Sequence, residues 1–104
     1  MKLQIRERDQ PLTKRLREHI ERRVGFALAR FGERVVRVMV RFSDGKGRPG
    51  KGKLCEIEVT LRPQTVRVED RDPDAFAAVD HVAARVSRSI ARALAEQPSS
   101  STRR

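Results

Sequence analysis

Several residue types that characterise particular protein classes are scarce in this sequence. Its 104 residues include one cysteine, no tryptophan and no tyrosine. A single cysteine, Cys55, excludes an internal disulfide framework and a zinc site built from several cysteines. No apolar run approaches the roughly 18–20 residues of a membrane-spanning helix, and the first residues, MKLQIRERDQ, lack the apolar segment of a signal peptide. We therefore expect a cytoplasmic protein.

Negative charge is scarce as well. The chain has 24 Lys+Arg against 14 Asp+Glu, a formal net charge of +10, and 19 of its cations are arginine. So large an excess favours a polyanionic partner, with nucleic acid ahead of an acidic protein or a membrane surface. The guanidinium group suits phosphate and stacks on bases. Codon usage in a GC-rich genome is an alternative explanation for the preference for arginine, but not for the positive excess.

Alternating apolar residues predict four strands. The alternation covers residues 1–6, 35–42 and 54–62, and a shorter stretch around 66–69. The stretch 54–62 shows it most clearly, because Cys55, Ile57, Val59 and Leu61 all fall on one side. A turn-rich, basic segment separates the second and third of these strands.

Helical spacing predicts two helices. The first begins at Thr13 as N-cap and is closed by Gly32. The second begins at Asp72 as cap with Pro73 as its first residue, and an apolar stripe runs from Phe76 to Leu94. We expect residues 1–97 to form a single domain and residues 98–104 to be a disordered tail.

The element order β-α-β-β-β-α predicts an α+β fold. One apolar sheet face and one apolar stripe on each helix give a two-layer sandwich, with both helices packed on the same face of a four-stranded sheet. The opposite sheet face carries charges of both signs, which predicts solvated cross-strand pairs: Arg37, Arg41, Glu56, Glu58, Arg67 and Glu69.

No arrangement of residues indicates catalysis, a metal or a cofactor. The glycines from Gly45 to Gly50 match G-x-G-x-x-G, but a strand follows them where a dinucleotide site needs a helix. Cys55 lies on an apolar strand face and is expected to be a buried, inert thiol. His19 is expected to pack beside the core, and His81 does not face its neighbour Asp80 on the helix. We therefore expect no enzyme and no small-molecule substrate.

A row of arginines on the second helix is the strongest functional signal. Arg85, Arg88 and Arg92 fall within a narrow arc, joined by His81, without an acidic residue of the helix between them. The first helix adds a weaker set, and the segment before the third strand adds a possible phosphate-contacting loop. The full predicted RNA-contacting set is Arg85, Arg88, Arg92, Arg17, Arg22, Arg23, Lys14 and His81, with Lys46, Arg48, Lys51 and Lys53 in the loop.

The aromatic residues indicate which parts of an RNA the protein would contact. The chain has only four phenylalanines, mostly at positions spaced like core residues. Proteins that bind single strands use exposed aromatic side chains for base stacking. Since no such residue is evident, we expect contacts to phosphates and to the shape of folded RNA.

Two segments resemble a known family. LTKRLREHIERRV and DPDAFAAVDHVAARVSRSIARAL, in this element order, resemble the ribosome hibernation-promoting factors, also called ribosome-associated inhibitors or subunit-interface proteins. Arg85, Arg88 and Arg92 occupy the places of three basic residues of that family, and the likeness covers roughly residues 1–94. Two features depart from the pattern: Phe26 stands where the family often has lysine, and the loop from Asp44 to Lys53 is longer and more basic.

The resemblance implies a ribosome-associated translation inhibitor. Such a protein binds RNA of the small ribosomal subunit in the mRNA and tRNA channel and promotes hibernation under stress. Only EQPSSSTRR follows the last helix, so we expect no domain for pairing two ribosomes. Two alternatives remain: a double-stranded RNA module that is not specific to ribosomes, against which the extra first strand argues, and an RNA-processing enzyme.

Overall fold

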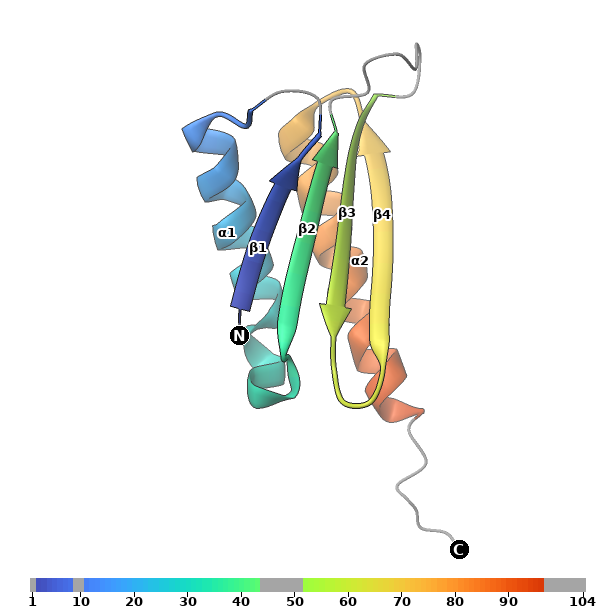
Figure 1. Cartoon of the computed structure of the whole chain (residues 1–104). Coiled ribbons are helices and arrows are strands. Elements are labelled where there is room, and N and C mark those ends of the chain that lie inside the picture. The colour runs from blue at the N-terminus through green and yellow to red at the C-terminus, as the bar shows by residue number, and fades with distance from the viewer. Residues whose placement is uncertain (1, 9–10, 44–51, 97–104) are drawn as a thin grey trace, which may run out of the picture.

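The computed structural model describes residues 2–8, 11–43 and 52–96. In that part of the chain four strands form one sheet in the order β1-β2-β3-β4, as Figure 1 shows. None of the helices described is long and apolar enough to cross a membrane. The predicted tail at 98–104 and most of the predicted basic loop lie outside the described residues.

The strands are longer or shifted by a few residues relative to the sequence prediction, but all four exist. They are β1 (Lys2–Glu7), β2 (Arg37–Ser43), β3 (Lys53–Thr60) and β4 (Thr65–Asp72). β1 pairs parallel to β2, whereas β2, β3 and β4 pair antiparallel. The parallel pair requires a crossover between β1 and β2, and the first helix provides it.

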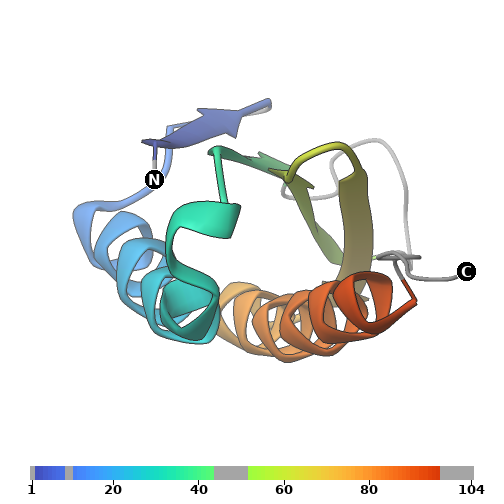
Figure 2. The ribbon, with the colours of Figure 1, turned by 90° about the horizontal axis from the view of Figure 1, so that it is seen from below.

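Both helices cover the same face of the sheet, as predicted. α1 (Lys14–Leu28) and α2 (Ala75–Ala95) lie side by side behind the strands, and the end-on view of Figure 2 places both on one side of the sheet. The core lies between the two layers. Its largest fully buried side chains include Ile20 and Leu28 of α1, Ile57 of β3 and Ile90 of α2.

The predicted first residues of the second helix are wrong by two positions. Asp72 ends β4, and its side chain accepts the backbone N–H of Asp74 at 2.9 Å. Asp74 is the N-cap and accepts from the N–H of Phe76 at 3.0 Å. Pro73 therefore connects strand to helix and is not part of α2. Asp72 and Asp74 are both residues that can cap a helix. Because β4 extends to Asp72, the helix is capped by Asp74.

The ends of α1 agree better with the sequence. Thr13 caps the helix by accepting from the N–H of Leu16 at 3.1 Å. After Leu28 the chain continues as a short 3-10 segment, η1 (Ala29–Arg34). Gly32 breaks the helical geometry inside that segment with φ 54° and ψ −128°. This positive φ favours glycine. Gly32 therefore ends the helical turns, as predicted, but the α-helix itself ends four residues earlier, at Leu28.

The outer face of the sheet is a network of opposite charges. Arg41 reaches Glu58 at 3.1 Å and Glu56 at 3.8 Å, and Arg67 lies 3.3 Å from each of the same carboxylates. The hydrogen bond from Arg41 lowers the pKa of Glu58, with a further contribution from Arg67. The predicted cross-strand pairing is therefore confirmed for these four residues.

We expect truncation of a side chain to cost much more stability on the buried face of the sheet than on the exposed face. Ile57→Ala removes a fully buried side chain and should lower the free energy of unfolding by about 2–5 kcal/mol. Arg37→Ala, on the exposed face of β2, is the control and should change it by less than about 0.5 kcal/mol. Urea unfolding of both variants measures the difference. Equal losses would contradict a core confined to one face.

We expect the thiol of Cys55 to be inert in the folded protein. Its side chain is completely buried, and burial, with a smaller effect of the Glu56 carboxylate, raises its pKa to about 12. The thiolate is the reactive form, so a thiol reagent at neutral pH should modify Cys55 only as the chain unfolds. Labelling rates with and without urea test this. A folded protein that reacts as fast as the unfolded one would contradict the assignment.

Candidate nucleic-acid interface

The side of α1 and α2 turned away from the sheet forms one continuous surface, which we call the outer helix face. It exists because both helices bury their opposite sides against the same sheet face (Figure 2). Exposed residues on it are Arg15, Arg22 and Phe26 of α1, and Ala84, Arg88 and Arg92 of α2.

A carboxylate between the helices holds this surface together. Oδ1 of Asp80 lies 2.7 Å from Nε2 of His19 and accepts from Nε of Arg23 at 3.0 Å. The ring of Phe76 packs against His19 with 4.9 Å between centroids. Asp80 thus joins α2 to α1 by two contacts. Asp80 does not pair with its neighbour His81, as predicted; its partners lie 61 and 57 residues away, which local spacing does not reveal.

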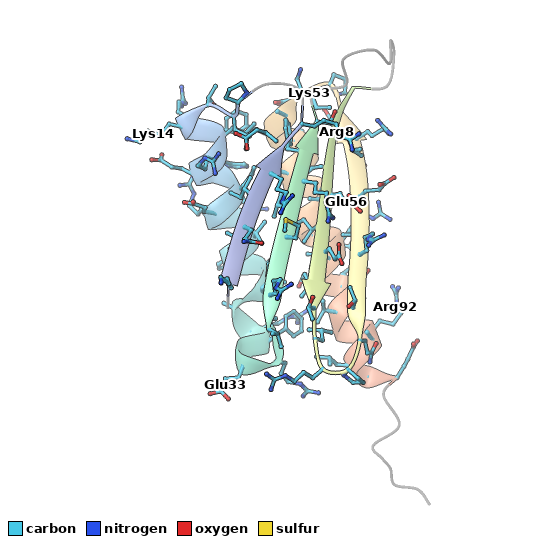
Figure 3. All side chains as sticks on the ribbon, viewed as in Figure 1. Arg8, Lys14, Glu33, Lys53, Glu56 and Arg92 are labelled. Carbon is cyan, nitrogen blue, oxygen red and sulfur yellow. The ribbon has the colours of Figure 1, made fainter. Side chains whose placement is uncertain are left out.

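Two of the three predicted arginines of α2 are available for a ligand. Arg88 and Arg92 are exposed, and their side chains make no hydrogen bond or ion pair with any residue in the described ranges. Arg22 and Lys14 of α1 are exposed too and, across the same ranges, equally unpaired. Figure 3 shows Lys14 near one end of the molecule and Arg92 toward the other, so cationic groups span the length of the layer.

Arg85 and His81 do have acidic neighbours, contrary to the prediction of a row of cations without them. Arg85 donates to the backbone carbonyl of Glu69 at 2.6 Å and lies 3.5 Å from Asp70. Nε2 of His81 lies 3.4 Å from Asp72. The carboxylates come from β4 beneath the helix. A helical projection of α2 alone does not contain them, which is why the sequence analysis missed both pairs.

The remaining predicted cations are partly engaged or outside the described residues. Arg17 lies 3.4 Å from Glu7 of β1, and half-buried Arg23 is held by Asp80. Lys53 is a half-buried residue of β3 at the end of the sheet opposite Arg92 (Figure 3). Lys46, Arg48 and Lys51 lie outside the described residues.

Phe26 contradicts the expectation that no aromatic side chain is exposed. Its side chain is 79% exposed and lines a groove between the helices together with Arg23, Ala27, Ala83, Ala84, Ser87 and Arg88. The sequence contained the signal. Phe26 is two residues from both Val24 and Leu28, about 200° around the helix from these core positions, and therefore points outward.

Arg30 is a second residue that the sequence analysis missed. From η1 it donates to Oγ of Ser87 at 3.2 Å, and its guanidinium lies over the ring of Phe31 at 4.7 Å. This contact places another cation beside the groove. Because Arg30 lies beyond the end of α1, the helical pattern did not include it.

The chemistry of the surface is that of anion binding. In the ranges that the structure describes, no group of three or more His, Cys, Asp or Glu side chains is arranged to hold a metal ion. The exposed arginines instead offer planar donors that match phosphate oxygens.

The architecture and this surface define a basic two-layer α+β domain, and comparison with known proteins identifies its family. Residues 3–97 match the family described as Sigma 54 modulation protein / S30EA ribosomal protein, and the chain belongs to that family. The resemblance found in the sequence to the hibernation-promoting factors is thereby confirmed. A comparison with curated proteins gives no match.

Solved structures similar to this chain include a domain of one bacterial protein and a second bacterial protein. The N-terminal domain of Protein Y from Thermus thermophilus is 26% identical, with a TM-score of 0.73, over 88% of this chain and 98% of that one. A ribosomal subunit interface protein from Coxiella burnetii is 18% identical, with a TM-score of 0.78, over 92% of this chain and 100% of that one. The second likeness concerns the fold alone.

We expect the Asp80 contact to stabilise the helix pair. Asp80→Asn keeps the shape of the side chain but removes the charge that pairs with Arg23 and lies beside His19. It should lower the free energy of unfolding by about 1 kcal/mol, since the carboxylate is partly exposed. Glu21→Gln, which removes an exposed carboxylate of α1, is the control and should have little effect. Urea unfolding that ranks the two variants in the opposite order would contradict the role of Asp80.

Proposed function

We propose that this protein binds RNA of the small ribosomal subunit through its outer helix face, occupies the mRNA and tRNA channel, and holds ribosomes idle under stress. Membership of the family, described as Sigma 54 modulation protein / S30EA ribosomal protein, supports a ribosomal partner. The observation that carries the proposal is a set of cations on one side of the domain that have no partner within the described residues: Arg22, Arg88 and Arg92.

The proposed mechanism is steric. Each arginine that contacts a phosphate releases condensed counterions, so affinity comes largely from charge and falls as salt increases. The two helices are held to the sheet by a continuous core, which presents the cations as a rigid array. A rigid domain in the channel excludes mRNA and tRNA without a chemical step, and no catalytic group takes part in this account.

The topology favours this proposal over a double-stranded RNA module. That module has the order α-β-β-β-α, whereas this chain adds β1, which pairs with all six of its residues against β2. β1 also places half-buried Leu3 and Ile5 against the core. The first strand is therefore an integral part of the fold.

Reversing two charges on the outer helix face tests the proposal. Arg88→Glu combined with Arg92→Glu should abolish most co-sedimentation with ribosomes at moderate salt and lower the slope of log affinity against log salt by about 2. Because both side chains are exposed, the domain should keep its thermal stability. Sucrose-gradient sedimentation with purified small subunits measures binding.

A charge-matched variant provides the control. Arg6→Glu with Arg37→Glu changes the net charge equally but on the outer face of the sheet, where both residues are exposed. It should bind nearly as the parent protein does. Equal weakening by both variants would indicate an unspecific polyanion effect and contradict the assignment of the face. Displacement of the parent protein by a rigid RNA duplex would favour the double-stranded RNA module.

A further inference from the structure

Phe26 is exposed without a structural reason. Phe42 is buried, Phe31 is half-buried under Arg30, and Phe76 is 37% exposed while it packs against His19. Phe26, in contrast, is 79% exposed and has no ring contact within the described part of the chain. Phe26 does not belong to the core or to the residues packed against it, so its side chain is available to a partner.

The groove beside Phe26 is shallow and lined by small side chains. It measures about 280 Å³, below the roughly 300–1,000 Å³ of pockets that enclose drug-sized ligands. Ala83, which is 2% exposed, lines it together with the small side chains of Ala84 and Ser87. A groove of this size accepts one flat group laid against the ring and does not enclose a cofactor.

The groove is flanked by cations. Arg23 and Arg88 line it, and Arg30 reaches its edge through Ser87. The neighbouring carboxylate, Asp80, is already shared between His19 and Arg23. An apolar aromatic surface with positive charge on two sides is complementary to a group that is flat and apolar at one end and anionic at the other.

We propose that Phe26 is a stacking platform for an unpaired RNA base, whose flanking phosphates are held by Arg88 and Arg23. The inference rests on the proposed function and specifies which RNA the outer helix face takes: a nucleotide outside a helix, because bases inside a duplex have no free face. Stacking on an aromatic ring tolerates any base. The protein thus adds a base contact to the phosphate contacts that its arginines make.

The absence of tryptophan and tyrosine from the chain gives a direct optical test. Phe26→Trp introduces the only tryptophan, at an exposed position where the larger ring disturbs no packing. A short oligoadenylate should quench its fluorescence and bind about tenfold more tightly than an abasic oligomer of the same length and charge. Equal affinities, or binding without quenching, would overturn the proposal.

Two further substitutions of Phe26 distinguish base stacking on an aromatic ring from a contact that needs only apolar surface. Phe26→Leu retains apolar surface and Phe26→Ala removes it. Both should weaken binding of oligoadenylate about tenfold while binding of the abasic oligomer stays unchanged. Thermal melting should show that both variants fold, since the side chain is exposed. A leucine variant that binds oligoadenylate as tightly as the parent does would show that the aromatic ring is not required, and would overturn stacking.

The same variants distinguish this inference from the proposed function. Phe26→Leu should lower co-sedimentation with small ribosomal subunits while leaving part of it, because the arginines remain. If the parent protein binds subunits and Phe26→Leu binds equally well, only the stacking platform fails. If the parent protein does not bind subunits but oligoadenylate still quenches Phe26→Trp, only the ribosomal target fails.

Discussion

Burial of one face of the four-stranded sheet under both helices determines the rest of the molecule. Alternate residues of β2 and β3 point into a single apolar layer, and α1 and α2 must both cover it. Their remaining sides then form a common surface on the far side from the sheet (Figure 2). A fold that placed the helices on opposite faces would divide the cations of α1 from those of α2. The shared core therefore places the cations of both helices on one surface.

The two exposed faces of the domain use charge in opposite ways. On the sheet, Arg41 and Arg67 are satisfied by Glu56 and Glu58. On the outer helix face, acidic partners are few in the described residues, and Asp80 is used to join the helices. Within the described residues, the central arginines of the sheet face are therefore paired, whereas Arg22, Arg88 and Arg92 of the outer helix face are not. Arginines already paired with carboxylates gain less from approaching phosphate, so the outer helix face is the better surface for a polyanion.

Periodicity in the sequence was sufficient to predict the strands, the helices and the single apolar face, because these depend on local spacing. It was insufficient where partners come from distant segments. Nothing near Arg85 in the sequence indicates Asp70 of β4, and nothing near His19 indicates Asp80. Phe26 is different: its spacing from the core residues of α1 places it outside, although phenylalanine is usually buried. The expectation that the chain has no exposed aromatic side chain is wrong at this position.

The central claim is that the outer helix face meets RNA of the small ribosomal subunit and the sheet face does not. Arginine modification with a guanidinium-selective reagent, followed by mass spectrometry of free and subunit-bound protein, tests it directly. The account predicts that binding protects Arg22, Arg88 and Arg92 while exposed Arg37 and Arg67 of the sheet react as in the free protein. Protection of the sheet arginines, with the helix arginines still reactive, would contradict it.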